Sequence, residues 1–99
     1  MTMNSTQNGA AMTIALEGRL DTTTAPELEK AVGQIPEEVT ALTLDFAELA
    51  YISSAGLRVV LAALKKMKAK KGDLVVRNMN ETIREVFDVT GFLDIVTVE

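Results

Sequence analysis

Strand-like runs alternate with helix-like segments along most of this chain of 99 residues, and this alternation limits its fold more than any other feature. Three segments place apolar residues at intervals of three and four, which is the spacing of one face of an α-helix. Strands that are joined through helices pair in parallel, with right-handed crossovers. The sequence therefore predicts a single α/β domain over residues 1–99 in the order β-β-α-β-α-β-α-β. We expect a mostly parallel sheet of four to five strands, with three helices covering one face.

Local signals place these elements. Asn8-Gly9 favours a tight turn and would join the first two strands in a hairpin. Thr24 and Glu27 have the spacing of a capping box at the start of the first helix, and Asn80 can cap the third. Residues 18–23 are expected to form a loop. The expected strands are residues 2–7, 12–16, 42–46, 74–76 and 95–98. The apolar face of the first expected helix is formed by Leu28, Ala31, Val32 and Ile35. That of the second is formed by Leu57, Val60, Leu61, Leu64 and Met67, and that of the third by Ile83, Val86 and Phe87.

The composition excludes several kinds of chemistry. The chain contains no histidine and no cysteine, so it holds neither a Ser-His nor a Cys-His nucleophile pair, and no zinc site of the usual ligand types. Its formal net charge of −4 argues against nucleic acid as a direct partner, because such affinity comes mostly from cationic contacts to phosphates. We expect a binding module that is not an enzyme and needs no metal or cofactor.

The N-terminus carries no targeting signal that we can identify. It lacks the basic start and the apolar stretch of a signal peptide, and no apolar run approaches the ~18–20 residues of a membrane helix. We therefore expect a cytoplasmic protein that does not insert into the membrane and is monomeric when free.

Half of the basic residues cluster near the end of the expected central helix. They could form a docking patch for an anion or an acidic partner. They also complement the negative end of the helix dipole, and charge runs of this kind are usually solvated faces. We expect most of these side chains to face solvent: Lys65, Lys66, Lys68, Lys70 and Lys71.

Asp21 lies in the expected loop between the second strand and the first helix. Strand-to-helix loops of open α/β sheets present residues to ligands. Asp21, or one of the threonines beside it, could equally cap the helix. The residues alone leave both interpretations open.

Ser53 and Ser54 stand directly before the central helix. One interpretation is an N-cap, in which a hydroxyl accepts a hydrogen bond from the first turn, worth about 1 kcal/mol. The other is a phosphorylation site, because a phosphate there would face unpaired N–H groups and the positive end of the helix dipole. The added charge could repel an acidic partner. Serines are common caps, so spacing alone favours the first interpretation.

Two spaced motifs resemble the STAS domain of anti-sigma factor antagonists. Gly18–Ala25 (GRLDTTTA) is similar to the Gly-x-Leu-Asp loop of that family, and Tyr51–Leu57 (YISSAGL) is similar to the Asp-Ser-Ser-Gly-Leu sequence that opens its central helix. The late segment Ile83–Phe92 (IREVFDVTGF) resembles the third helix of the family. The resemblance covers essentially the whole chain and implies one STAS domain over residues 1–99.

The resemblance also implies roles for particular residues. The phosphorylated serine of the family falls at Ser54, while Ser53 replaces the preceding aspartate and is the alternative phosphorylation site. Asp21 matches the loop aspartate on the surface that meets the anti-sigma factor. The partner-binding residues implied in this way are Asp21, Thr22, Thr23, Ser53, Ser54, Ala55, Gly56 and Arg58.

The function implied is partner switching. The unmodified protein would bind an anti-sigma factor that is itself a serine kinase, phosphorylation at Ser54 would lower that affinity, and a serine phosphatase would reset the cycle. An alternative keeps the STAS fold as a subunit that steadies the ATPase of a bacterial lipid-transport ABC complex, without phosphorylation. A Ser-Lys hydrolase is a poor fit, because Lys65, the nearest lysine in sequence, lies about three turns along the same helix from Ser54.

Overall fold

In the computed structural model, which describes all residues from 1 to 99, the chain forms five strands, three α-helices and one 3₁₀-helix. The elements are β1 (Thr2–Asn8), β2 (Ala11–Leu20), α1 (Ala25–Gly33), β3 (Ala41–Ile52), α2 (Ser54–Ala69), β4 (Asp73–Arg77), α3 (Glu81–Val89), η1 (Phe92–Asp94) and β5 (Thr97–Val98).

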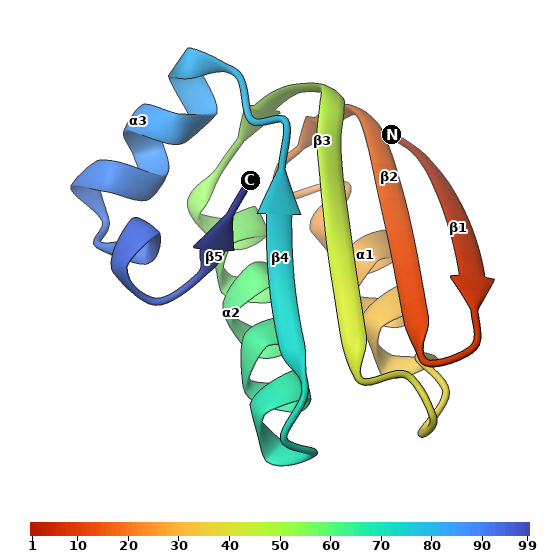
Figure 1. Cartoon of the computed structure of the whole chain (residues 1–99). Helices are drawn as coiled ribbons and strands as arrows, with labels where there is room; N and C mark the ends of the chain where they lie inside the picture. Colours follow the sequence, from red (N-terminus) through yellow and green to blue (C-terminus); the bar gives the residue numbers. More distant parts are fainter.

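The strands form one sheet in the spatial order β1-β2-β3-β4-β5 (Figure 1). β1 is antiparallel to β2, and every other neighbouring pair is parallel. The predicted α/β fold and the predicted element order are therefore confirmed. The expected hairpin is also present, and its two turn residues are Gly9 and Ala10.

The helices cover one face of this sheet. Figure 1 shows α1 and α2 side by side behind the central strands, with α3 displaced toward the edge that carries β4 and β5. α3 reaches the same face through Phe87, whose ring meets that of Phe46 on β3 edge-to-face at 6.2 Å. The opposite face of the sheet is left without a covering layer (Figure 1).

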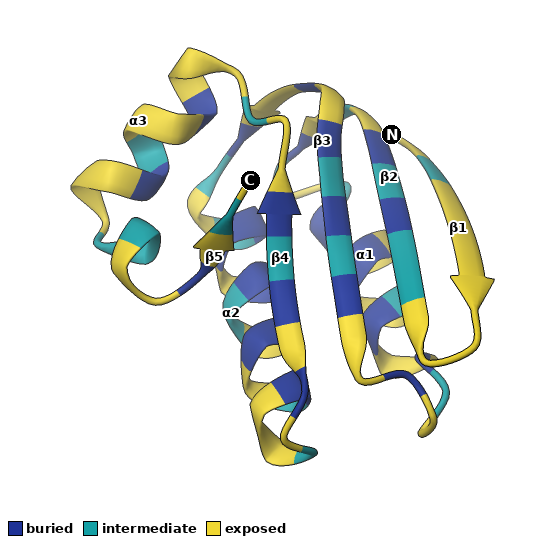
Figure 2. Ribbon diagram, in the orientation of Figure 1, coloured by how far each residue is buried: buried dark blue, intermediate teal, exposed yellow.

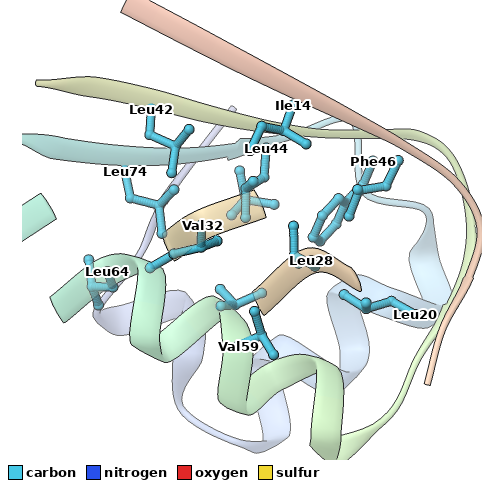
Figure 3. Close-up of a cluster of buried hydrophobic side chains, with 14 of the residues drawn as sticks. Ile14, Leu20, Leu28, Val32, Leu42, Leu44, Phe46, Val59, Leu64 and Leu74 are labelled. Carbon is cyan, nitrogen blue, oxygen red and sulfur yellow. The ribbon is translucent and has the colours of Figure 1, made fainter. Parts of the chain in front are cut away.

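Alternation along the strands decides which side chains enter the core. On β3, Leu42, Leu44 and Phe46 are buried beneath the helices, while Thr43 and Asp45 between them are partly exposed on the open face, so the strand is banded in Figure 2. All 24 buried side chains of the core cluster are hydrophobic. Figure 3 shows side chains from the sheet and from α1 and α2 converging between the two layers.

β2 and β3 both extend beyond their predicted ends. β2 continues through Gly18 to Leu20, where we expected a loop, and β3 continues six residues past Phe46. The register along this pair shifts twice, so that β3 carries an extra residue on each occasion. Such β-bulges interrupt the period of two by which a strand is recognised, and for this reason the sequence pattern ended the strand too early.

The lysine cluster is only partly a solvated face. Lys65, Lys68 and Lys71 are exposed, as expected for most of the cluster. Lys66 instead donates to the backbone oxygen of Val32 at 2.8 Å. Lys70 donates to three backbone oxygens of the segment after α1, the shortest of these bonds being 2.9 Å. Lys66 therefore holds the end of α1, and Lys70 the segment that follows it, against the end of α2.

The C-terminal strand is shorter than expected. The 3₁₀-helix η1 occupies Phe92–Asp94, and only Thr97–Val98 pairs with β4. Ile95, placed in the predicted strand, is half exposed, whereas Val96 is buried in the core. No helix of the structure is both long enough and apolar enough to cross a lipid bilayer.

Candidate functional site

The carboxyl ends of β2 and β3 bring the two sequence motifs together. These strands are parallel neighbours, so both end at the same edge of the sheet. Directly past their last residues, the Ser53 N–H donates to the Leu20 carbonyl oxygen at 2.9 Å. This bond joins the start of α2 to the loop that contains Asp21.

The Asp21 loop is held closed by its own side chains. The Asp21 carboxylate accepts hydrogen bonds from the Thr23 hydroxyl at 2.8 Å and from the backbone N–H groups of Thr23 and Thr24. The Thr24 hydroxyl accepts from the Asp21 N–H at 2.8 Å and donates to the Arg19 carbonyl at 2.7 Å. The predicted capping box of Thr24 with Glu27 is therefore wrong: the hydroxyl is used inside the loop, and Thr24 makes no side-chain cap.

Asp21 orders the turn before α1 but does not cap the helix, whose start has no side-chain cap. The hydrogen bond from the Thr23 side chain, with the backbone bonds beside it, lowers the pKa of Asp21 below its usual range. The carboxylate is thus charged at neutral pH and orders the turn before α1. It is also partly exposed, and its second oxygen lies 3.7 Å from Nε of Arg19. A partner can therefore reach a negative group whose position the turn fixes.

The two candidate serines differ sharply in exposure. Ser54 is the first residue of α2 and is exposed. The Ser53 hydroxyl is buried and has no hydrogen-bond partner, and the side-chain cap considered for it is absent. The first intrahelical bond of α2 runs from the Leu57 N–H to the Ser53 carbonyl. The N–H groups of Ser54, Ala55 and Gly56 precede that bond, so they have no partner within the helix.

Gly56 allows α2 to begin close to the sheet. A Cβ atom at this position would lie 2.8 Å from both Ile52 Cγ1 and Leu20 Cγ, and 3.0 Å from the Leu20 carbonyl oxygen. Side chains essentially never approach so closely, so any larger residue would move the helix start away from β2 and β3. Gly56 is therefore a spacer that positions Ser54, and it is itself buried.

The remaining predicted residues lie in the Asp21 loop and in the first turns of α2. Thr22 and Thr23 are exposed in the loop, Ala55 is partly buried, and Arg58 is exposed one helical turn after Ser54. The surface has a single groove, of about 260 Å³, and it lies elsewhere, along α3. Its lining contains none of the predicted site residues: Glu81, Arg84, Glu85, Asp88 and Leu93.

Sequence reasoning missed two residues at this edge. Arg19 and Tyr51 pair across β2 and β3, and the Arg19 guanidinium stacks over the Tyr51 ring, 4.3 Å from its centroid. Both residues lie within the quoted motifs, and Tyr51 is the single tyrosine of the chain. The pairing itself depends on a register shift that local sequence does not reveal.

Replacing Ser53 with alanine is expected to leave the free energy of unfolding unchanged or to raise it by up to about 1 kcal/mol, because the hydroxyl is buried without a partner. Asn80→Ala is the matched control, since the Asn80 side chain accepts from the Ile83 N–H at 2.8 Å and caps α3. That variant also loses the bond from Asn80 Nδ2 to the Leu49 carbonyl oxygen, and its free energy of unfolding should fall by at least about 1 kcal/mol. Denaturant unfolding measures both, and an equal loss in Ser53→Ala would show that Ser53 caps α2.

Comparison with known proteins identifies the family. The STAS domain family matches residues 2–99. The chain belongs to the STAS domain family. Within it, the chain belongs with the anti-sigma factor antagonists, as the relatives in sequence show.

Two of these relatives illustrate the similarity. BtrV of Bordetella bronchiseptica, which is assigned as an anti-sigma factor antagonist, is 39% identical over 84 residues, covering 84% of this chain and 72% of BtrV. The anti-sigma-B factor antagonist of Listeria monocytogenes is 31% identical over 88 residues, covering 87% of this chain and 76% of that protein.

Solved structures of the anti-sigma factor antagonist SpoIIAA share the fold. The unphosphorylated form is 21% identical with a TM-score of 0.75, covering 99% of this chain and 87% of SpoIIAA. The phosphorylated form from Bacillus is 22% identical with a TM-score of 0.71, covering 99% of this chain and 91% of SpoIIAA.

Proposed function

We propose that this protein is an anti-sigma factor antagonist whose binding to an anti-sigma factor is switched by phosphorylation of Ser54. The observation that carries the proposal is the exposed Ser54 hydroxyl at the first residue of α2, at the same edge of the sheet as the Asp21 loop. Relatives that are named anti-sigma factor antagonists support the class of partner.

Ser54 is the modified residue in this proposal because a kinase must reach the hydroxyl oxygen. The Ser54 side chain is exposed, whereas the Ser53 oxygen has almost no contact with solvent. Phosphorylating Ser53 would require its buried oxygen to become accessible first. Exposure thus separates two neighbouring serines that the sequence leaves as alternatives.

A phosphate on Ser54 would change the surface charge without unfolding α2. It brings about −1.5 to −2 charges at neutral pH. The unpaired N–H groups of the first turn and the positive end of the α2 dipole would stabilise it, and Arg58 follows one turn later on the exposed side. SpoIIAA keeps the shared fold in both of its forms, which fits a switch of this kind.

The chemistry of the cycle belongs to the partners. A serine-kinase anti-sigma factor would transfer the γ-phosphoryl group of ATP to Ser54 Oγ, with ADP leaving and the hydroxyl proton passing to a base of the kinase. A serine phosphatase would return the group to water as inorganic phosphate. This chain acts as the substrate and as the binding partner of the anti-sigma factor. Because the cycle needs ATP and an anti-sigma factor, it implies a cytoplasmic setting.

The proposal is tested by incubating the protein with ATP and the serine-kinase anti-sigma factor of its own cell, followed by intact-mass measurement and site mapping. We expect one phosphate on the wild type and on Ser53→Ala, and none on Ser54→Ala. We also expect the phosphorylated protein to bind the anti-sigma factor roughly tenfold or more weakly, because like charges set against each other at an interface cost several kcal/mol. Calorimetric titration of both forms measures this ratio.

Ser53→Ala and Ser54→Ala differ by one position and remove the same atom, so each controls for the other. A phosphate that persists on Ser54→Ala would reassign the site. Failure of the unmodified wild type to bind the anti-sigma factor would reject the function itself.

A further inference from the structure

We infer that Arg19 and Tyr51 form an anchor for the anti-sigma factor beside Ser54, one that receives a carboxylate together with an adjacent apolar side chain. This inference rests on the proposed function and extends its interface beyond the Asp21 loop and the start of α2. We call the pair the Arg19–Tyr51 platform.

A β-bulge turns Tyr51 toward the outside. Leu49 of β3 pairs with Gly18 and faces the core, and Tyr51 pairs with the next residue of β2, Arg19. Ala50 is thus the extra residue, and it reverses the alternation of the strand, so that Ile52 is buried and Tyr51 is exposed. Bulges beside functional sites commonly redirect a side chain in this way.

The Arg19 guanidinium is held in position, but its hydrogen-bond donors are not used within the protein. Its guanidinium stacks on the Tyr51 ring, and Nε lies 3.7 Å from the Asp21 carboxylate. The side chain donates none of the hydrogen bonds found in the structure, and 62% of its surface is exposed. A guanidinium carries five N–H donors in a planar fork that matches a carboxylate. Most of these N–H donors are therefore available to a partner, and the Tyr51 ring and Asp21 hold the guanidinium in its orientation.

Tyr51 supplies the apolar half of the platform. It is one of only three large hydrophobic side chains that are exposed, at 37%. The other two, Val89 and Ile95, lie around the C-terminal end of α3. Tyrosine and arginine are enriched among the few residues that dominate interface energies. One face of the ring is already covered by Arg19, so less conformational entropy is lost when a partner covers the rest.

The platform is continuous with the proposed switch. Ile52 is the single residue between Tyr51 and Ser53, and the exposed Ser54 comes next. Just past the end of β2, Asp21 contacts Arg19 directly. A partner seated on Ser54 and the Asp21 loop would therefore meet these two side chains as well. Because the chain is acidic overall, an exposed arginine held at this edge selects for a negative group on that partner.

The test separates docking from phosphoryl transfer by measuring KM and kcat for phosphorylation by the serine-kinase anti-sigma factor, together with Kd for the unphosphorylated complex. We expect Tyr51→Ala to raise KM and Kd about tenfold or more, as truncation of a dominant interface residue does, and to leave kcat unchanged. Arg19→Ala should raise KM and Kd in the same way. In the double variant, the fold increase in Kd should be smaller than the product of the two single increases, because the two side chains contact each other.

Two variants control for the loss of side-chain surface and of fold. Tyr51→Phe keeps the ring that stacks on Arg19 and should retain a KM within about threefold of the wild type. Val89→Ala removes an apolar side chain that is 77% exposed on α3 and should change neither KM nor Kd. Thermal unfolding of each variant establishes that it is folded.

The outcomes are distinguishable from those that test the proposed function. Wild-type values of KM and Kd in folded Tyr51→Ala would overturn the anchor while phosphorylation of Ser54 still stood. A fall in kcat with unchanged KM would also overturn it, since that result would place the platform in the reaction rather than in docking. If the wild type is neither bound nor phosphorylated, the proposed function fails first.

Discussion

Phe87→Ala is expected to lower the free energy of unfolding by about 3–5 kcal/mol, the largest effect of any single truncation that we predict. Phe87 is fully buried and is one of only two buried side chains on α3, the other being Ile83. Its ring meets Phe46 of β3 at 6.2 Å and Phe92 of η1 at 5.7 Å, both edge-to-face. The alanine would remove the aromatic contacts that help to join α3 and η1 to the sheet, and would leave a cavity there.

Denaturant unfolding measures this loss, because a change in the midpoint at constant slope reports stability alone. Val89→Ala is the matched control: it lies on the same helix, it is exposed, and its effect should stay within about 0.5 kcal/mol. A loss below about 1 kcal/mol for Phe87→Ala would mean that α3 is held to the sheet by other contacts.

Gly56→Ala is expected to destabilise the protein by about 1–3 kcal/mol, the cost of adding a methyl group to a packed site. The new Cβ would fall 2.8 Å from two side-chain carbons and 3.0 Å from the Leu20 carbonyl oxygen. The start of α2 must shift to relieve this overlap. Because Ser54 lies two residues earlier in that first turn, affinity for the anti-sigma factor should fall as well.

Gly33→Ala is the control for this prediction, since the same substitution is expected there to change the free energy of unfolding in the opposite direction. Nothing lies within 4 Å of a Cβ at Gly33, which is the last residue of α1. Alanine there should stabilise the protein by about 0.4–1 kcal/mol, by reducing the freedom of the unfolded chain. Thermal unfolding compares the two, and stabilisation by both would show that the first turn of α2 tolerates a side chain.

Local periodicity predicted the fold class because each element can bury its apolar residues in only one way. Leu28 and Val32 recur at the spacing of a helix face, and Leu42, Leu44 and Phe46 alternate as on a half-buried strand. The same patterns failed where the elements depart from regular geometry. The bulged end of β3 was not recognised, since it lacks the period of a regular strand, and the last strand was predicted two residues too long, because η1 and its C-cap Ile95 come before β5.

Only part of the candidate functional site could be predicted from the sequence. Asp21 and Ser54 were assigned to one surface through the resemblance of their motifs to the STAS family, and in the structure the two motifs meet where the Ser53 N–H donates to the Leu20 carbonyl oxygen. The competing cap at Ser53 could not be decided in this way. Its hydroxyl is buried and unbonded as a result of how the start of α2 packs on β2, which involves residues far apart in the chain.

The sequence by itself determined the order of the elements, the parallel sheet and the hydrophobic core, because these follow from the spacing of apolar residues within single segments. It also determined that the chain lacks the histidine and cysteine of common catalytic sites. Only the tertiary structure decided that Ser54 is exposed while the Ser53 hydroxyl is buried, and that Tyr51 faces Arg19. Both outcomes depend on register and packing between β2, β3 and α2, and such contacts are made by residues that no local pattern relates.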